Sequence, residues 1–441
     1  MATTYLTRTG ATPTTSNKYT FSCWVKRGSI GTTETIFRTY SDGSNSAQLI
    51  FDSDDTFAFQ DIVGGTTVTN LKPSNLFRDT GAWMNFIVQV DYTQATAADR
   101  AKIFINGAEV SYSATTVQSQ NGASMLNTAN NNALGSNRSN SSHYFTGSMS
   151  QVNFIDGTAY PATAFGSVNA TSGIWVANSG PTVTYGNNGF FLDMANSSDM
   201  GNDVSGNAND FTVGGGTVTQ MEDTPDNNFA TWNPLVQQSS GFVLSNGNTT
   251  ADNTNDTWRS VYSTLAPSVG KYYFECKIVN QLQTPRSIIG VCSTTQASNS
   301  SARLGYEGTN AYAYGSDGNK INNGTNTSYG NTFATGDIIS CALDLDNGKI
   351  YFGKNGTWQN SGDPTSGSTG TGSAFNVTLG ESYYFGSASY GNDGIISINS
   401  GNGYFQTTAV ASAGTNASGN GIFEYDVPTG YTALSTKGLN L

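Results

Sequence analysis

The chain has 441 residues, a length typical of two or three domains, and a net charge of −12 from 19 Lys and Arg against 31 Asp and Glu. No basic stripe is present to neutralise phosphates, which excludes nucleic acid as a partner and leaves no polybasic patch for acidic lipids. No run of about 18 apolar residues occurs, so we expect no membrane insertion.

The composition predicts an all-β protein. Charged residues make up only 11% of the chain, whereas aromatic residues make up 12% and Gly occurs 51 times. Aromatic residues favour strands, and Gly favours the tight turns between them. The one modest helical stretch that we expect is Thr93–Lys102.

The first segment, residues 1–165, alternates strand-like runs with turn residues. Tyr19, Phe21, Cys23 and Val25 share one face of the first run, and Asn106-Gly107 marks a turn in a later one. Short strands at this spacing predict a sandwich or jelly roll. The expected strands are Tyr19–Lys26, Leu49–Phe59 (two short strands around an acidic turn), Trp83–Asp91, Lys102–Val110 and Gly147–Asp156.

These motifs also carry a family resemblance. FSCWVKRG, the Trp83–Asp91 run, IFINGAEV and GSMSQVNFIDG follow one another in the order of the laminin-G-like, concanavalin-A-like lectin fold. The resemblance covers residues 1–165 and implies a lectin-type β-sandwich.

Residues 166–240 are dense in turns and have few apolar runs of strand length. This composition predicts a connector or a small module between two sandwiches. The segments YGNNGFFLDMANSSDMGNDVSGNANDF and TPDNNFATWNP resemble a connector in virion proteins of marine tailed bacteriophages. In those proteins a laminin-G-like part precedes a second sandwich.

The third segment, residues 241–405, contains the strongest local signal of the chain. In residues 336–358, two alternating runs flank Asp346-Asn347-Gly348, and Asn355-Gly356 follows eight residues later. Asn-Gly between alternating strands predicts a hairpin with a type I′ turn, whose two central residues need positive φ. Ile339, Cys341 and Leu343 lie on the core face. Other expected strands are Gly270–Val279, Ile288–Cys292, Ser382–Phe385 and Ile395–Phe405.

In this order GKYYFEC, YAYGSDGNKINNG, the Gly336–Asp344 run and GKIYFGKNG resemble a SPRY domain. The resemblance implies a second β-sandwich whose loops bind protein partners, and it transfers no catalytic residues. The remaining residues, 406–441, resemble the closing segment of the same phage proteins. Because this tail ends apolar on a polar chain, we expect it to dock rather than to remain free.

Nucleophilic catalysis finds little support in the sequence. The only histidine, His143, lies in a polar, turn-like stretch, where a solvated loop histidine is expected. The four cysteines, Cys23, Cys276, Cys292 and Cys341, sit in apolar runs without CxxC spacing. They are expected to be buried thiols rather than zinc ligands.

Glycoside hydrolysis needs only two placed carboxylates, so the lack of histidine does not exclude it. No E-x-D-x-E-like run is present; the nearest acidic clusters are Asp52-Ser53-Asp54-Asp55 and Glu424-Tyr425-Asp426. We therefore assign no catalytic residue and keep a hydrolase as the alternative. No cofactor is assigned either. Calcium is the ion that loop carboxylates would suit, although solvated turn carboxylates are the favoured explanation. The candidates are Asp42, Asp52, Asp54, Asp55 and Asp156.

Aromatic side chains are the remaining recognition candidates, because sugars stack on rings and interfaces favour Tyr and Trp. Trp24 alternates with Ser22 and Lys26 and is expected to face outward. Ordinary strand packing is the competing explanation for each ring, so the binding residues stay unassigned. The other candidates are Tyr306, Tyr312, Tyr314, Tyr329 and Trp358.

The sequence thus predicts a non-enzymatic virion protein of a tailed bacteriophage, with two concanavalin-A-like sandwiches and a connector. A tail fibre or spike that adheres to host glycans or proteins through many weak contacts is the first placement. A capsid decoration or head-fibre protein is the second, and a bacterial adhesin is a third. The first residues lack a charged region leading into an apolar run, so no signal peptide is expected. The composition is typical of an extracellular surface protein, although no export signal is expected. Release in a virion by host lysis would explain both features. Other virion proteins and further copies of the chain are the expected partners.

Overall fold

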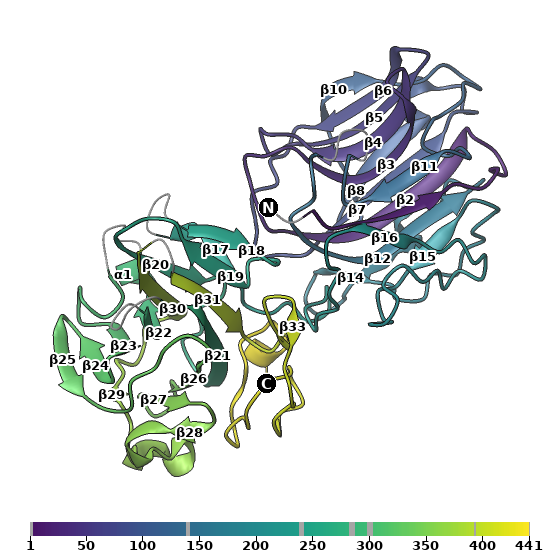
Figure 1. The fold of residues 1–441 in the computed structure, drawn as a ribbon. Helices are drawn as coiled ribbons and strands as arrows, with labels where there is room; N and C mark the ends of the chain where they lie inside the picture. The colour runs from purple at the N-terminus through teal and green to yellow at the C-terminus, as the bar shows by residue number, and fades with distance from the viewer. Residues whose placement is uncertain are drawn as a thin grey trace. The chain divides into compact units, whose positions relative to one another are not determined.

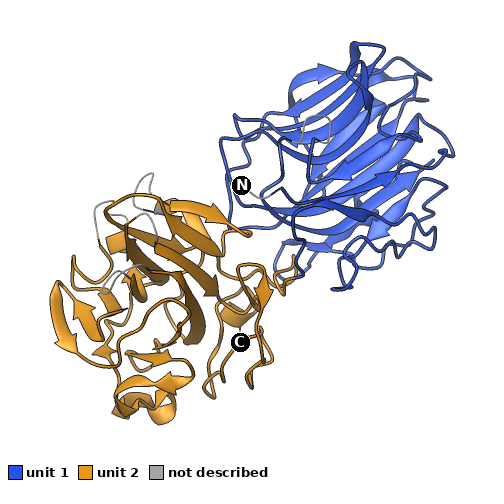
Figure 2. Cartoon of the chain, viewed as in Figure 1, with its two compact units in different colours: residues 1–220 blue, residues 221–441 orange. Residues whose placement is uncertain are grey.

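A computed structural model describes residues 3–137, 142–237, 242–281, 287–297, 303–391 and 394–440. Strands dominate these residues, and their one α-helix is the single turn α1 (Thr294–Ala297). The all-β prediction is confirmed. The chain divides into two compact units, Met1–Gln220 (unit 1) and Met221–Leu441 (unit 2), coloured blue and orange in Figure 2. None of the described helices is long and apolar enough to cross a membrane.

Unit 1 is a sandwich of an eight-stranded and a six-stranded sheet (Figure 1). The larger sheet has the order β10 (Tyr112–Thr116), β6 (Thr66–Pro73), β5 (Phe57–Val63), β4 (Asn45–Phe51), β3 (Glu34–Asp42), β11 (Asn131–Leu134), β1 (Tyr5–Thr9) and β16 (Thr212–Gly215). The smaller has the order β15 (Phe190–Leu192), β12 (Gly147–Asp156), β2 (Lys18–Arg27), β7 (Met84–Asp91), β8 (Ala101–Ile105) and β9 (Ala108–Glu109).

Aromatic rings from the two sheets meet in the core of unit 1. Phe21 on β2 stacks on Phe37 of β3 with ring centroids 5.3 Å apart, and Phe57 on β5 contacts Phe86 of β7 at 4.8 Å. Each of these rings is fully or almost fully buried. Burial of such rings between the layers is the main favourable term that holds the sandwich closed.

Unit 2 is a second two-sheet sandwich. One sheet has the order β17 (Trp232–Gln237), β20 (Trp258–Ser263), β30 (Tyr383–Tyr390), β22 (Ser287–Ser293), β23 (Ala311–Gly315), β24 (Asn319–Asn322) and β25 (Thr325–Ser328). The other has the order β18 (Phe242–Ser245), β19 (Thr250–Asn253), β31 (Gly394–Asn399), β21 (Lys271–Asn280), β26 (Ile338–Asp344), β27 (Lys349–Lys354) and β28 (Thr357–Trp358), with β29 (Phe375–Asn376) on β27 and β34 (Thr432–Ala433) on β21.

The predicted hairpin of unit 2 is β26 and β27, paired from Ile339–Lys354 to Asp344–Lys349. Its turn is not the expected type I′. Four residues, 345–348, separate the strands, and of Asn347 and Gly348 only Gly348 has a positive φ. The Asp344 carboxylate accepts the backbone N–H groups of residues 346 and 347, which stabilises this wider loop. At Asn355-Gly356 both residues have positive φ, as a type I′ turn requires.

The expected helix over Thr93–Lys102 is wrong. Only the 3₁₀ turn η1 (Ala97–Asp99) forms there, and Lys102 already belongs to β8. The Arg100 side chain donates to the carbonyls of Gln94 and Ala95 and so closes the segment into a loop. The segment also has no apolar stripe that a helix would bury.

Residues 166–240, expected as a connector, contribute to both units. β13 (Gly166–Val168) and β14 (Trp175–Ala177) form a small sheet, β15 pairs with β12, and β16 pairs with β1. The boundary between the two compact units falls between residues 220 and 221. The expected boundary at 240/241 lies outside the described residues. Trp175 lies over Gly107 and Gly166, where an added Cβ would come within 2.5 Å of its ring. The segment thus covers the outer face of a sheet.

The C-terminal residues cover the outer face of the nine-stranded sheet of unit 2 in the same way. Along β21, Tyr272 and Phe274 point into the sandwich, while Tyr273 points to the opposite face. Tyr273 is nevertheless fully buried, because Phe423 and other apolar residues of the chain end pack on it. A two-residue parallel pairing of β34 with β21 adds to this contact. Apolar residues between Phe423 and Ala433 therefore pack within unit 2, whereas Leu439 is exposed.

Candidate functional site

The residue types that nucleophilic chemistry would need, histidine and cysteine, are not placed for it among the described residues. His143 is exposed, and its Nδ1 lies 3.0 Å from the Asn137 side-chain amide, which neither activates a nucleophile nor orients a base. All four cysteines are buried and free. Burial raises the pKa of each thiol, to about 12 for Cys292, so these groups stay protonated and inert near neutral pH.

The calcium candidates are occupied by groups of the chain itself. Lys72 Nζ lies 3.1 Å from Asp52 and 3.0 Å from Asp54. The Asp55 carboxylate binds Arg27 at 3.2 Å and Arg78 at 2.9 Å. Positively charged side chains at these distances compete with a cation for the same oxygens.

Asp156 and Asp42 serve the backbone. Asp156 accepts the N–H groups of Thr14 and Asn188 and the side-chain amide of Asn127. Asp42 accepts the N–H of Ser44 in its own turn. Within the described ranges, no group of three or more His, Cys, Asp or Glu residues is arranged to hold a metal ion.

Most of the aromatic candidates belong to the cores. Tyr312, Tyr314 and Tyr329 are buried in unit 2, where Tyr314 stacks on Phe352. Trp24 lies on the outer face of β2, as alternation predicts, but its side chain is buried there, with only 3% exposed. β2 is an interior strand with β7 and β12 on either side, so its outer residues are flanked on both sides.

Two aromatic candidates remain partly exposed. Tyr306 packs on the Arg303 guanidinium, whose carbon lies 3.6 Å from the ring centroid, and Trp258 contacts the same group at 3.4 Å. Trp358 instead lines a pocket of about 530 Å³ in unit 2.

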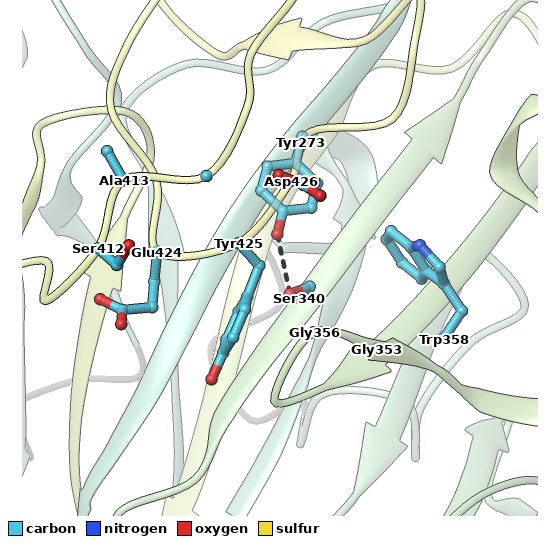
Figure 3. A pocket seen from close by; sticks show the side chains of 11 residues that line it. Tyr273, Ser340, Gly353, Gly356, Trp358, Ser412, Ala413, Glu424, Tyr425 and Asp426 are labelled. Carbon is cyan, nitrogen blue, oxygen red and sulfur yellow. Dashed lines mark hydrogen bonds between the residues drawn. The ribbon is translucent and has the colours of Figure 1, made fainter.

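The pocket lies between the nine-stranded sheet and the chain end (Figure 3). The sheet contributes Tyr273 from β21, Ser340 from β26 and Trp358 from β28. The chain end contributes residues 412–414 and 424–426. Figure 3 shows Trp358 at one side of the pocket, with Ser412 and Glu424 at the other.

A buried carboxylate fixes the chain end against the sheet. Glu275, two residues after Tyr273 on β21, accepts the backbone N–H of Glu424 at 2.9 Å and of Tyr425 at 2.8 Å. The Tyr273 hydroxyl donates to the same carboxylate at 2.9 Å and lies 2.9 Å from Ser340 Oγ. Burial raises the pKa of Glu275 to about 7, although these donors counteract it.

The two carboxylates of the pocket hold its rim. Glu424 Oε2 accepts the Ala411 N–H at 2.7 Å, and Asp426 Oδ1 accepts the N–H and the hydroxyl of Thr415 at 2.6 and 2.8 Å. The Thr415 N–H and hydroxyl lower the pKa of Asp426. These contacts join the two arms of the segment 411–427, whose backbones also pair from Gly414 N–H to the Phe423 carbonyl.

In the sequence, Trp358 and the cluster Glu424-Tyr425-Asp426 are separate candidates, and no local signal gives Tyr273 or Ser340 a role. Their juxtaposition depends on how the chain end folds back over β21, which strand periodicity does not encode. The pocket offers rings and oxygen acceptors, and among the residues that the structure describes no Lys, Arg or His side chain lines it. Such a lining suits stacking and hydrogen bonding to a ligand that brings its own donors.

Comparison with known families agrees with these two sandwiches. Residues 2–163 match the concanavalin A-like lectin/glucanases superfamily, and residues 271–375 match the SPRY domain. The chain contains both domain types. The SPRY match ends before residues 412–426, so part of the pocket wall lies outside the matched domain.

Curated relatives are similar to a short stretch of the chain. Ran-binding protein 9 of Danio rerio is 34% identical over 94 residues, which is 21% of this chain and 15% of the relative. Ran-binding protein 9 of Homo sapiens is 35% identical over 94 residues, which is 21% of this chain and 12% of the relative. The chain thus spans less than a fifth of the length of the curated relatives it matches.

Among solved structures, the SPRY domain of human HERC1 is 20% identical, with a TM-score of 0.30, over 38% of this chain and 96% of that one. The structure of stonustoxin is 18% identical, with a TM-score of 0.28, over 38% of this chain and 27% of that one.

Proposed function

We propose that this protein is a non-enzymatic adhesion protein of a tailed bacteriophage virion, a tail fibre or spike that binds cell-surface glycans or proteins. The observation that carries the adhesive role is the presence of two sandwich domains of binding type on one chain. Weak contacts of single copies would add up to stable attachment on an oligomeric appendage. The low charge and turn-rich surface composition suit an extracellular particle.

The chemistry of the pocket supports binding over cleavage. A glycosidase needs one carboxylic acid with a raised pKa and a second carboxylate, both reaching the substrate. Of the two carboxylates that line the pocket, Glu424 and Asp426, each accepts a backbone N–H of the rim, and Asp426, whose pKa is lowered, stays ionised and cannot act as the acid. Glu275 has a raised pKa, but its carboxylate is buried under the chain end and does not line the pocket.

A polysaccharide hydrolase is the rival function, since the family matched by unit 1 includes glucanases as well as lectins. A capsid decoration or head-fibre protein is the rival placement. The virion placement itself is supported by the resemblance of the residues 166–240 to phage connectors.

Labelling of intact phage particles with antibodies against the purified chain tests the placement. We expect label at the tail; label over the capsid lattice would favour the decoration role, and unlabelled particles would overturn the virion assignment. Incubation of the chain with purified host-surface polysaccharide tests the adhesive role. We expect retention of the polysaccharide without new reducing ends, whereas a steady release of reducing ends would establish a hydrolase.

A further inference from the structure

The pocket of unit 2 has the form of a small-molecule site built on aromatic rings. Its volume of about 530 Å³ lies within the range of about 300–1,000 Å³ that is typical of such sites. Trp358 and Tyr273 pack edge to face, with centroids 6.3 Å apart and planes at 72°. Tyr425 packs on the Asn355-Gly356 turn, where a Cβ on Gly356 would come 2.8 Å from its ring. The three rings are thus held in place by the fold.

Each carboxylate of the pocket has an oxygen left for a ligand. The contacts within the described part of the chain use Oε2 of Glu424 and Oδ1 of Asp426, as given above. Oε1 and Oδ2 remain as acceptors beside the hydroxyl of Ser412, which is exposed. A carboxylate oxygen beside a ring is suited to the hydroxyl donors of a sugar, whose C–H face stacks on the ring.

The charge of this region disfavours acidic ligands. Glu424 and Asp426 bring two carboxylates to the pocket, and the underlying Glu275 brings a third carboxyl group. Lys354 is bound to Asp337 at 3.0 Å and does not line the pocket. An anionic ligand would meet like charges without a paired cation, which costs binding energy.

We propose that this pocket binds an uncharged saccharide of a cell-surface glycan, with Trp358 as the stacking platform and Glu424 and Asp426 as hydroxyl acceptors. The inference rests on the adhesive role proposed above and names its site and ligand class. A cationic side chain of a protein partner would also be attracted to carboxylates and rings. However, an ammonium group fills only a small part of about 530 Å³, and the open pocket leaves water around it.

Saturation-transfer NMR on the full chain tests the ligand class. The probes are the methyl glycosides of glucose, galactose, mannose, fucose, rhamnose and N-acetylglucosamine, with methyl galacturonate anion and Nα-acetyl-lysine amide as charged comparisons. We expect transfer to at least one neutral glycoside and less to the galacturonate. No transfer to any neutral glycoside at tens of millimolar, equal transfer to the galacturonate, or transfer to the lysine derivative alone would overturn the inference.

Variants locate the binding within the molecule. Trp358→Ala is expected to reduce the transfer to the neutral glycoside at least fivefold, while Trp358→Phe keeps part of it. Trp258→Ala is the matched control, because Trp258 is a partly exposed tryptophan of the same unit on the other sheet. Glu424→Gln keeps a carbonyl acceptor for the Ala411 N–H and should weaken binding less than Trp358→Ala does. Equal signals from Trp358→Ala and Trp258→Ala would place the sugar elsewhere.

Attachment of the same variants to host cells separates this inference from the proposed function. Attachment of the wild-type chain that is unchanged by Trp358→Ala would refute the pocket and leave the adhesive role intact. No attachment by the wild-type chain would refute the adhesive role itself. Circular dichroism of each variant confirms that a lost signal reflects a lost contact rather than an unfolded chain.

Discussion

The carboxylate of Glu275 accepts the backbone N–H of Tyr425 at 2.8 Å, across 150 residues of sequence. This contact ties the chain end to the central strand of its sheet and places Tyr425 in the pocket wall. It also buries an acidic group whose pKa is raised to about 7, mainly by burial. Protonation of Glu275 and docking of the chain end are therefore linked.

The docked chain end is predicted to weaken as pH rises from about 4.5 to 7. Between these pH values the docked state binds more protons than the undocked state. The free energy that favours docking is therefore fully present below a pH of about 4.5 and is lost as the pH rises through about 7. The difference between the two pKa values corresponds to roughly 3 kcal/mol in the free energy of docking. Glu275→Gln should flatten this dependence. Amide hydrogen exchange at Tyr425 between pH 5 and 8, corrected for its intrinsic rate, measures it; identical profiles for both proteins would contradict the prediction.

Removal of the Tyr273 hydroxyl should destabilise unit 2 by about 1–3 kcal/mol, because Tyr273→Phe leaves a buried carboxylate oxygen with one donor fewer. It should also raise the pKa of Glu275 further, since the hydroxyl lowers that pKa. Denaturant unfolding gives the stability, and a carboxyl titration followed by NMR gives the pKa. An unchanged midpoint together with an unchanged pKa would show that the hydroxyl bonds are not formed in solution.

Gly356→Ala is expected to disturb the pocket beyond the usual cost of an unfavourable backbone angle. Gly356 has φ near 79°, and a Cβ there would come 2.8 Å from Tyr425. Gly380 has φ near 82° with nothing within 4 Å, so Gly380→Ala is the matched control. Both variants should lose about 1 kcal/mol from the positive φ, and Gly356→Ala should lose more. Equal losses in thermal unfolding would mean that Tyr425 does not pack on this turn.

Calcium is not expected to stabilise unit 1. Its loop carboxylates Asp52, Asp54 and Asp55 already contact Lys or Arg side chains at 2.9–3.2 Å. The melting temperature should therefore be the same in millimolar calcium and in chelator. A higher melting temperature in calcium than in chelator would show that the cation displaces these side chains and that the carboxylates are calcium ligands.

The strands were the most predictable feature of the sequence, because alternation and turn residues are local signals. Gly147–Asp156 was predicted with the bounds that β12 has, and Gly270–Val279 differs from β21 by one residue at each end. The turn at Asn347-Gly348 was less predictable. Its type depends on the Asp344 carboxylate, which holds the backbone in a wider loop.

The candidate site was only partly predictable. Trp358 was identified from its place beside a hairpin, but alternation alone could not separate it from the buried Tyr314 and Tyr329. Alternation along the strand places Tyr273 and Glu275 at outward-facing positions, like those of any strand with one buried face. Their role depends on a chain end about 150 residues away that folds over them, and no local pattern encodes this contact.

Attachment to host cells of the wild-type chain and of Trp358→Ala, with Trp258→Ala alongside, tests the central claim most directly. We predict that Trp358→Ala loses most of the attachment, that Trp258→Ala keeps it, and that an excess of the neutral glycoside competes with the wild-type chain. Undiminished attachment by a folded Trp358→Ala protein would contradict the claim that this chain holds its target through the pocket of unit 2.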